Sequence, residues 1–129
     1  FNVYGNGWDG FKHWRGLLPP LDIGKLYTSA KSAVGIIAKR QREHGMINNR
    51  YTEMAICGIP IITYNYDTVD WYGAEQYLNF ISTPVELKEK VSDIKTHPDD
   101  YQFESENLQK FMIQKDKEFF EKLNTLIKE

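Results

Sequence analysis

The sequence is short of cysteine, of long apolar runs and of charge of one sign. Its 129 residues contain one cysteine, Cys57, so the chain cannot form an internal disulfide. No apolar run approaches the ~18 residues that a membrane span needs, and no charged and then apolar leader opens the chain. A formal net charge of -2 gives neither a basic surface for nucleic acid nor a strongly acidic tail. These absences predict a cytoplasmic protein with no transmembrane segment and no nucleic-acid partner.

Enough apolar and aromatic side chains are present for one core. Hydrophobic residues make up 41% and aromatic residues 14% of the sequence, so we expect residues 1–129 to form a single domain. The chain begins with Phe1 rather than methionine, and residues 1–4 already have the composition of a strand. We therefore expect a fragment of a longer chain, cut just upstream of its first strand.

Short apolar segments alternate with amphipathic ones, which indicates an α/β domain with a parallel sheet. Strands are expected at residues 1–4, 33–38, 60–64 and 77–81, and helices at residues 22–30, 49–57, 84–96 and 103–128. Thr83, Pro84 and Glu86 combine a cap, a proline at the first helical position and a capping-box glutamate, which predicts a helix start. Residues 39–48 have the pattern of a polar loop, and the charged run at residues 115–118 that of a bend or a solvated turn.

The helix at residues 103–128 carries an apolar stripe that includes Phe111, Phe119 and Leu123. Such a stripe is usually part of a core. If a partner domain is missing, however, part of the stripe can be exposed and can drive self-association.

The junction at residues 48–64 is the most informative part of the chain. Asn48 and Asn49 can cap a helix, and Glu53 lies near the positive helix end, which favours a carboxylate. Gly58 suits the left-handed position just past a helix, and Pro60 prevents the helix from continuing into the strand that follows. On position alone, Glu53 needs no role beyond complementing the helix dipole.

The same junction resembles the donor-binding helix of GT-B glycosyltransferases. Residues 48–53, Asn-Asn-Arg-Tyr-Thr-Glu, are similar to the N-x-R-x-F-E form of the CgeB-like subgroup, and residues 57–60 to the family's Cys-Gly-x-Pro. Residues 16–30 and 83–87 are similar to two further family elements, in the family's order. The resemblance implies that residues 1–129 are the nucleotide-sugar-binding half of a GT-B fold: a Rossmann-like parallel sheet flanked by helices, with C-terminal helices.

The resemblance also implies roles for residues of the donor-binding helix. Glu53 would accept hydrogen bonds from the ribose hydroxyls of the nucleotide sugar, because its two oxygens can take both donors at once. Arg50 would meet the diphosphate or a second carboxylate. The backbone N–H groups from Asn49 to Tyr51 would face phosphate.

Gly5, Gly7 and Gly45 are further candidates for residues that face the donor. Residues 5–10 match the G-x-G-x-x-G spacing of dinucleotide sites, but the aromatic and proline-containing stretch after them is not the helix that such a site requires. Gly5 and Gly7 are expected instead in a glycine-rich turn that faces the donor at the interdomain cleft. Gly45 either lets the backbone approach the donor closely or makes a loop turn. Many retaining relatives place a glutamate where this chain has Gly45, so the catalytic residues and the stereochemistry stay open.

The resemblance implies a set of partners as well. They are a nucleotide-diphosphate sugar and an N-terminal acceptor-binding domain that is missing from this chain, with no metal or other cofactor. The three histidines lie far apart in the sequence, which does not favour a metal site. Two alternatives remain: a non-catalytic nucleotide-binding or interaction module of the same fold, and half of a sugar-nucleotide epimerase.

Overall fold

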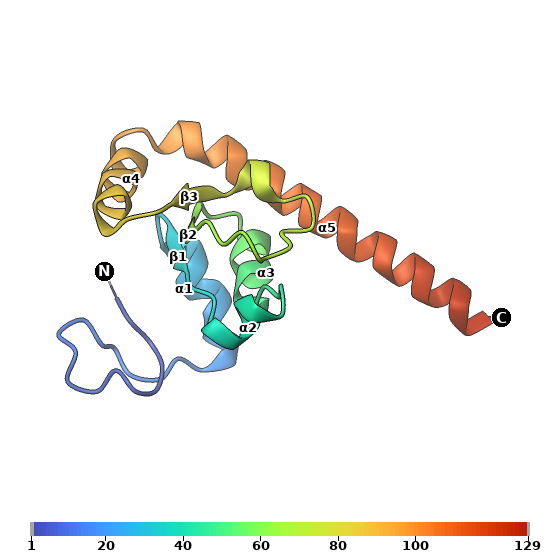
Figure 1. Ribbon diagram of the computed structural model, residues 1–129, viewed down its shortest axis with the longest axis horizontal. Helices are drawn as coiled ribbons and strands as arrows, with labels where there is room; N and C mark the ends of the chain where they lie inside the picture. Colours follow the sequence, from blue (N-terminus) through green and yellow to red (C-terminus); the bar gives the residue numbers. More distant parts are fainter. Residues whose placement is uncertain (1, 129) are drawn as a thin grey trace.

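Three parallel strands with helices around them form the fold of the computed structural model, which describes residues 2–128 (Figure 1). In chain order the elements are the 3-10 helix η1 (Pro20–Asp22), α1 (Ile23–Ser29), β1 (Ala33–Gly35), α2 (Lys39–Glu43), α3 (Asn49–Ile56), β2 (Ile61–Tyr64), the 3-10 helix η2 (Glu75–Tyr77), β3 (Asn79–Ile81), α4 (Pro84–Thr96) and α5 (Pro98–Lys128). The sheet order is β1-β2-β3, and both neighbouring pairs are parallel. The predicted α/β class with a parallel sheet and C-terminal helices is confirmed.

The central strand β2 supplies both faces of the sheet. Successive side chains of a strand point to opposite faces, and the neighbours Ile61 and Ile62 belong to different hydrophobic clusters. Ile61 packs with residues of α3, whereas Ile62 packs with Ile94 of α4. The continuous apolar run in β2 is therefore explained by burial on both faces, as is usual for a parallel strand.

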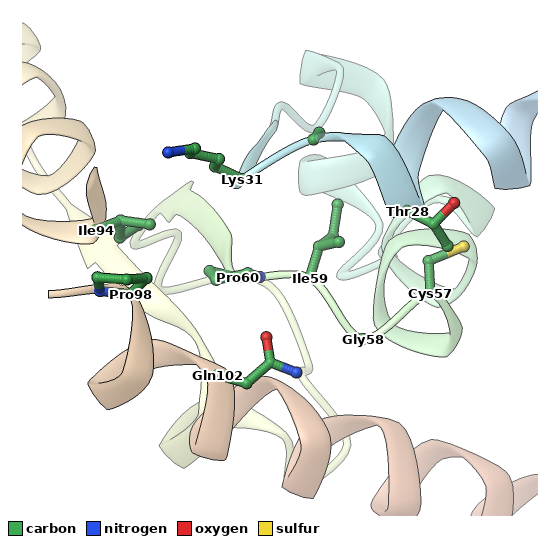
Figure 2. Close-up of a pocket in the computed structure, with 10 residues that line it drawn as sticks. Thr28, Lys31, Cys57, Gly58, Ile59, Pro60, Ile94, Pro98 and Gln102 are labelled. Carbon is green, nitrogen blue, oxygen red and sulfur yellow. The ribbon is translucent and has the colours of Figure 1, made fainter. Parts of the chain in front are cut away.

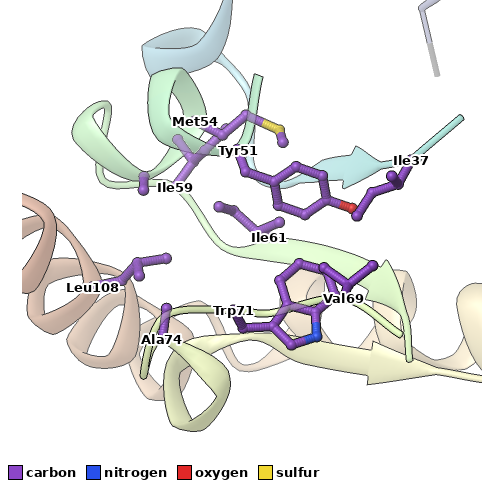
Figure 3. Close-up of a cluster of buried hydrophobic side chains, with 10 residues drawn as sticks. Ile37, Tyr51, Met54, Ile59, Ile61, Val69, Trp71, Ala74 and Leu108 are labelled. Carbon is purple, nitrogen blue, oxygen red and sulfur yellow. The ribbon is translucent and has the colours of Figure 1, made fainter. Parts of the chain in front are cut away.

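Helix α3 is fixed to the sheet by Tyr51 (Figure 3). Its ring crosses Gly35 so closely that a Cβ added to Gly35 would lie 2.4 Å from Cζ of the ring. The tyrosine hydroxyl lies 2.5 Å from Oγ1 of Thr63 on β2, and the ring meets Trp71 edge-on with 5.4 Å between centroids. A glycine in β1 thus makes room for an aromatic ring that ties α3 to two strands.

The predicted helix ends at α3 and α4 are confirmed. Gly58 has φ +66°, the left-handed conformation expected just past α3. At the start of α4, Oγ1 of Thr83 accepts from the Glu86 N–H at 3.2 Å, and Oε2 of Glu86 accepts from the Ser82 N–H at 2.8 Å. The caps satisfy backbone donors that have no partner within the helix.

Two expectations for the first half of the chain are wrong. Residues 39–48 are not all loop, because Lys39–Glu43 form α2, where Oε1 of Gln41 accepts from the Ala38 N–H at 3.3 Å. In the described part of residues 1–4, Val3 makes only an isolated bridge to Trp14; Phe1 lies outside the described residues. The Val3 backbone pairs instead with His13 and Arg15, so the segment folds back on itself rather than joining the sheet.

The C-terminal helix also differs from the expectation. It begins at Pro98 rather than at residue 103, because proline at the first helical position has no N–H to satisfy and a fixed φ. It continues through residues 115–118 without a bend, and ion pairing at 3.5 Å between Lys115 and Glu118 one turn apart supports it there. Its last part projects from the body (Figure 1) and leaves Phe119 61% exposed. Self-association through this stripe stays a prediction.

Within residues 2–128, no helix combines the length and the apolar character that crossing a membrane requires.

The contact between Gly35 and Tyr51 can be tested by substitution. We expect Gly35→Ala to lower the free energy of unfolding by about 1–3 kcal/mol, because the new methyl group overlaps the Tyr51 ring. Gly24→Ala in α1 is the matched control: it meets open space and should be neutral or stabilising by up to ~1 kcal/mol. Denaturant unfolding measures both, and equal stability of Gly35→Ala and the native chain would contradict this packing.

Candidate functional site

The start of α3 is held to the end of β1 by the side chain of Asn48. Its Oδ1 accepts from the Arg50 N–H at 3.1 Å, and its Nδ2 donates to the carbonyl oxygen of Ile36 at 3.1 Å. The predicted cap is thus confirmed for Asn48. Because Ile36 follows β1, the same side chain also sets the helix start at the carboxyl edge of the sheet, where ligands of open α/β sheets bind.

Glu53 is the centre of a polar cluster on α3. Nη1 of Arg50 donates to Oε2 of Glu53 at 2.7 Å, and Nδ2 of Asn49 donates to Oε1 at 3.4 Å. The side chains of Arg50 and Glu53 are 52% and 32% exposed, so solvent and ligands can reach the pair. The hydrogen bond to Glu53 raises the pKa of Arg50, which keeps the guanidinium charged.

Two further polar groups adjoin this cluster. Burial raises the pKa of the Tyr27 hydroxyl on α1, an effect that the nearby Arg50 partly offsets. Burial, and after it the negative charge of Glu53, raise the pKa of the Cys57 thiol. Tyr27, Arg50, Glu53 and Cys57 therefore share one electrostatic environment on the side of α3 that faces α1. The arrangement offers an oriented carboxylate that can accept hydrogen bonds from hydroxyl groups.

Tyr51 belongs to the core rather than to this exposed cluster. The residue is 4% exposed, and burial raises the pKa of its hydroxyl to about 12. Its backbone N–H donates to the carbonyl oxygen of Asn48, while the Arg50 N–H donates to the Asn48 side chain. These two N–H groups, which the sequence suggested for phosphate, already have partners within the protein.

The structure does not bring Gly5 and Gly7 together with Glu53. Both glycines have positive φ, +122° and +79°, in a segment where the Gly5 N–H donates to the carbonyl oxygen of Gly16 and Nε1 of Trp14 donates to that of Gly5. Figure 1 draws this N-terminal segment apart from α3. The glycines therefore shape a local turn beside the domain.

Gly45 makes a turn and a close backbone contact. It has φ +67°, its N–H donates to the carbonyl oxygen of Arg42, and a Cβ there would lie 3.1 Å from the carbonyl oxygen of Thr68. The Asp70 N–H donates to its carbonyl oxygen at 3.3 Å. Gly45 thus joins the segment after α2 to the loop after β2.

The loop after β2 also contacts Arg42, a residue that sequence reasoning missed. The Arg42 guanidinium on α2 lies over the ring of Tyr66, with 4.8 Å from Cζ to the ring centroid. The available signal was positional: an arginine soon after β1 and an aromatic residue soon after β2, since both strands end at the same edge.

A cavity of about 330 Å³ lies at the opposite, amino edge of the sheet (Figure 2). Its lining comes from the segments before β1 and β2 and from α4 and α5: Thr28, Ala30, Lys31, Cys57, Gly58, Ile59, Pro60, Ile94, Pro98 and Gln102. None of the seven residues predicted to bind the donor lines this cavity. In the described part of the chain, no group of three or more histidine, cysteine or acidic residues is placed to hold a metal ion.

The reactivity of Cys57 can test the cluster without a ligand. We expect Glu53→Gln to lower the pKa of the thiol, because a neighbouring negative charge is removed, and so to speed labelling by a disulfide reagent at about pH 8. Since Cys57 is the single cysteine of the chain, the labelling kinetics report it alone. Glu104→Gln, at an exposed position on α5, is the control. Identical labelling rates for the native chain, Glu53→Gln and Glu104→Gln would show that the charge of Glu53 does not act on the Cys57 thiol.

Comparison with known proteins finds a family whose model matches nearly the whole chain. A family model described as glycosyl transferase-like matches residues 1–125, which include the sheet, the start of α3 and the Glu53 cluster. The chain matches no curated protein and no solved structure. A match across nearly the full length accords with the sequence resemblance noted above, and the chain belongs to the glycosyl transferase-like family.

Proposed function

We propose that this chain is the donor-binding domain of a glycosyltransferase and contributes the nucleotide-sugar site for transfer to an acceptor. The observation that carries the proposal is the carboxylate of Glu53, partly exposed and oriented by Arg50 and Asn49 at the helix that the family resemblance assigns to the donor. Membership of the glycosyl transferase-like family supports the reaction class.

The chemistry of Glu53 suits the ribose of a nucleotide. A carboxylate has about four acceptor positions on its two oxygens, and Arg50 and Asn49 use one on each oxygen. Capacity therefore remains for two vicinal hydroxyl groups, and the charged acceptor makes those hydrogen bonds stronger than neutral ones. Arg50 would fix the orientation of the carboxylate and offset its charge, which assigns it a positioning role beside the ribose.

Residues 1–129 on their own are expected to have only part of the activity of the whole enzyme. We expect the acceptor to bind to a further, N-terminal domain, so residues 1–129 alone should bind the nucleotide sugar weakly and should not catalyse transfer. No metal ion is required by the proposal, and a cytoplasmic location goes with it as a prediction.

One observation favours a second candidate, a non-catalytic nucleotide-binding or interaction module of the same fold. At Gly45, where many retaining relatives carry an acid, φ is +67° and a Cβ would approach Thr68 to 3.1 Å. A glutamate would be strained there, so this backbone is not arranged for an acid at that position.

Nucleotide binding tests the role of Glu53. We expect Glu53→Ala to weaken binding of the preferred nucleoside diphosphate or its sugar by about 1–3 kcal/mol, the scale of hydrogen bonds to a charged group. Isothermal titration calorimetry with uridine, guanosine, thymidine and cytidine diphosphates and their sugars measures this. Circular dichroism should stay unchanged, and Glu104→Ala on α5 should bind as the native chain does.

Three results would contradict parts of the proposal. Unaltered affinity of Glu53→Ala would remove this residue from the site. Failure of the native chain to bind any of these nucleotides would favour an interaction module. Robust sugar transfer by the 129-residue chain would refute the need for a separate acceptor domain.

A further inference from the structure

Arg42 and Tyr66 meet at the carboxyl edge of two neighbouring parallel strands. Arg42 lies on α2, just after β1, and Tyr66 lies just after β2. The guanidinium carbon is 4.8 Å from the centroid of the tyrosine ring, within the range of a cation–π contact. Both side chains are half-buried. Ligands of open α/β sheets bind in the crevice outside these strand ends.

The Arg42 side chain has hydrogen-bonding capacity that the protein does not use. Its Nε is buried and has no hydrogen-bond partner among the described residues. The ion pair found within α2 joins Lys39 to Glu43 at 3.7 Å, and none is found for Arg42 in residues 2–128. A guanidinium is always charged and carries five donors in a fixed fork, so an unpaired one favours an anionic acceptor.

Arg50 is a poorer candidate for the same role. Its Nη1 already donates to Glu53 at 2.7 Å, so much of its charge is offset within α3. The backbone N–H groups of Arg50 and Tyr51 are likewise taken by Asn48. Of Arg42 and Arg50, Arg42 is the one whose charge lacks an acidic partner within residues 2–128, and its buried Nε has no hydrogen-bond partner there.

The surroundings of Arg42 are held in place. The carbonyl oxygen of Gly45 accepts from the Asp70 N–H at 3.3 Å, and Gly45 packs against the Thr68 backbone. Oδ1 of Asp70 accepts from the Tyr72 N–H at 2.8 Å, so this acid is engaged within its own loop. The segment after α2 and the loop after β2 therefore form one connected surface that orients the stacked guanidinium.

We propose that Arg42, oriented by stacking on Tyr66, receives the phosphate groups of the ligand at the carboxyl edge of β1 and β2. This inference rests on the proposed function, since it assigns the diphosphate of a nucleotide sugar to Arg42 and leaves Arg50 to position Glu53. The planar fork of arginine can donate two parallel hydrogen bonds to phosphate oxygens, whereas lysine offers only a point charge.

Calorimetric titration with inorganic pyrophosphate, uridine diphosphate and guanosine diphosphate tests the inference at about 0.15 M salt, where weak surface attraction is screened. We expect Arg42→Gln to weaken binding of pyrophosphate and of the preferred nucleotide by about tenfold or more. Arg40→Gln is the matched control, because it removes the same charge from an exposed position of the same helix, and it should bind as the native chain does.

A second variant, Arg42→Lys, keeps the inference testable if Arg42→Gln does not fold. Arg42→Lys keeps the charge and the aliphatic stem but loses the planar fork, so its affinity should fall between those of the native chain and Arg42→Gln. Circular dichroism identifies any variant that does not fold. Native affinity in both Arg42 variants, or failure of the native chain to bind any of the three compounds, would overturn the inference.

The remaining outcomes separate this inference from the proposed function. If Arg42→Gln binds nucleotide as the native chain does while Glu53→Ala binds it more weakly, the Arg42 inference fails and the proposed function stands. If pyrophosphate binding depends on Arg42 but no nucleotide or nucleotide sugar binds more tightly than pyrophosphate, the phosphate site stands and the proposed function fails.

Discussion

The positions of Asn49, Arg50 and Glu53 in the proposed site depend on how α3 is set against the sheet. Tyr51 crosses Gly35 and its hydroxyl meets Thr63, which fixes both the distance and the rotation of the helix. Glu53 lies two residues later, roughly 200° further around the helix axis. Locking Tyr51 inward therefore directs Glu53 away from the sheet, toward α1 and solvent. The same constraint explains why β1 contains a glycine in its last position.

The two edges of the sheet have different characters. At the carboxyl edge, Asn48 ties the start of α3 to Ile36, and Arg42 stacks on Tyr66. At the amino edge lies a cavity of about 330 Å³, with a mixed lining and none of the residues proposed for the donor. We assign the ligand to the carboxyl edge because charged groups with unused hydrogen-bonding capacity gather there, and because parallel sheets bind ligands on that side. The size of a cavity is a weaker argument than the chemistry of its surroundings.

Local sequence signals predicted the parts of the fold that depend on neighbours in sequence. The Asn48 cap, the left-handed Gly58 and the capping box of Thr83 and Glu86 need only a few adjacent residues. Features set by distant contacts were missed. The pattern of residues 1–4 resembles a strand, but whether a strand forms depends on a partner, and Val3 pairs within its own segment. The contact between Arg42 and Tyr66 joins residues that no local pattern relates; their positions just after two parallel strands place them at the same edge, but the structure shows that they stack.

The central claim is that nucleotide binds at the carboxyl edge, between the exposed cluster of α3 and the end of α2. Mapping amide chemical-shift changes in the 129-residue chain during titration with the best-binding nucleoside diphosphate sugar tests it most directly. We predict saturable changes at Arg42 and from Asn49 to Glu53. Changes confined to Thr28, Lys31 and Gln102 at the opposite edge, or no changes with any nucleotide, would contradict the account.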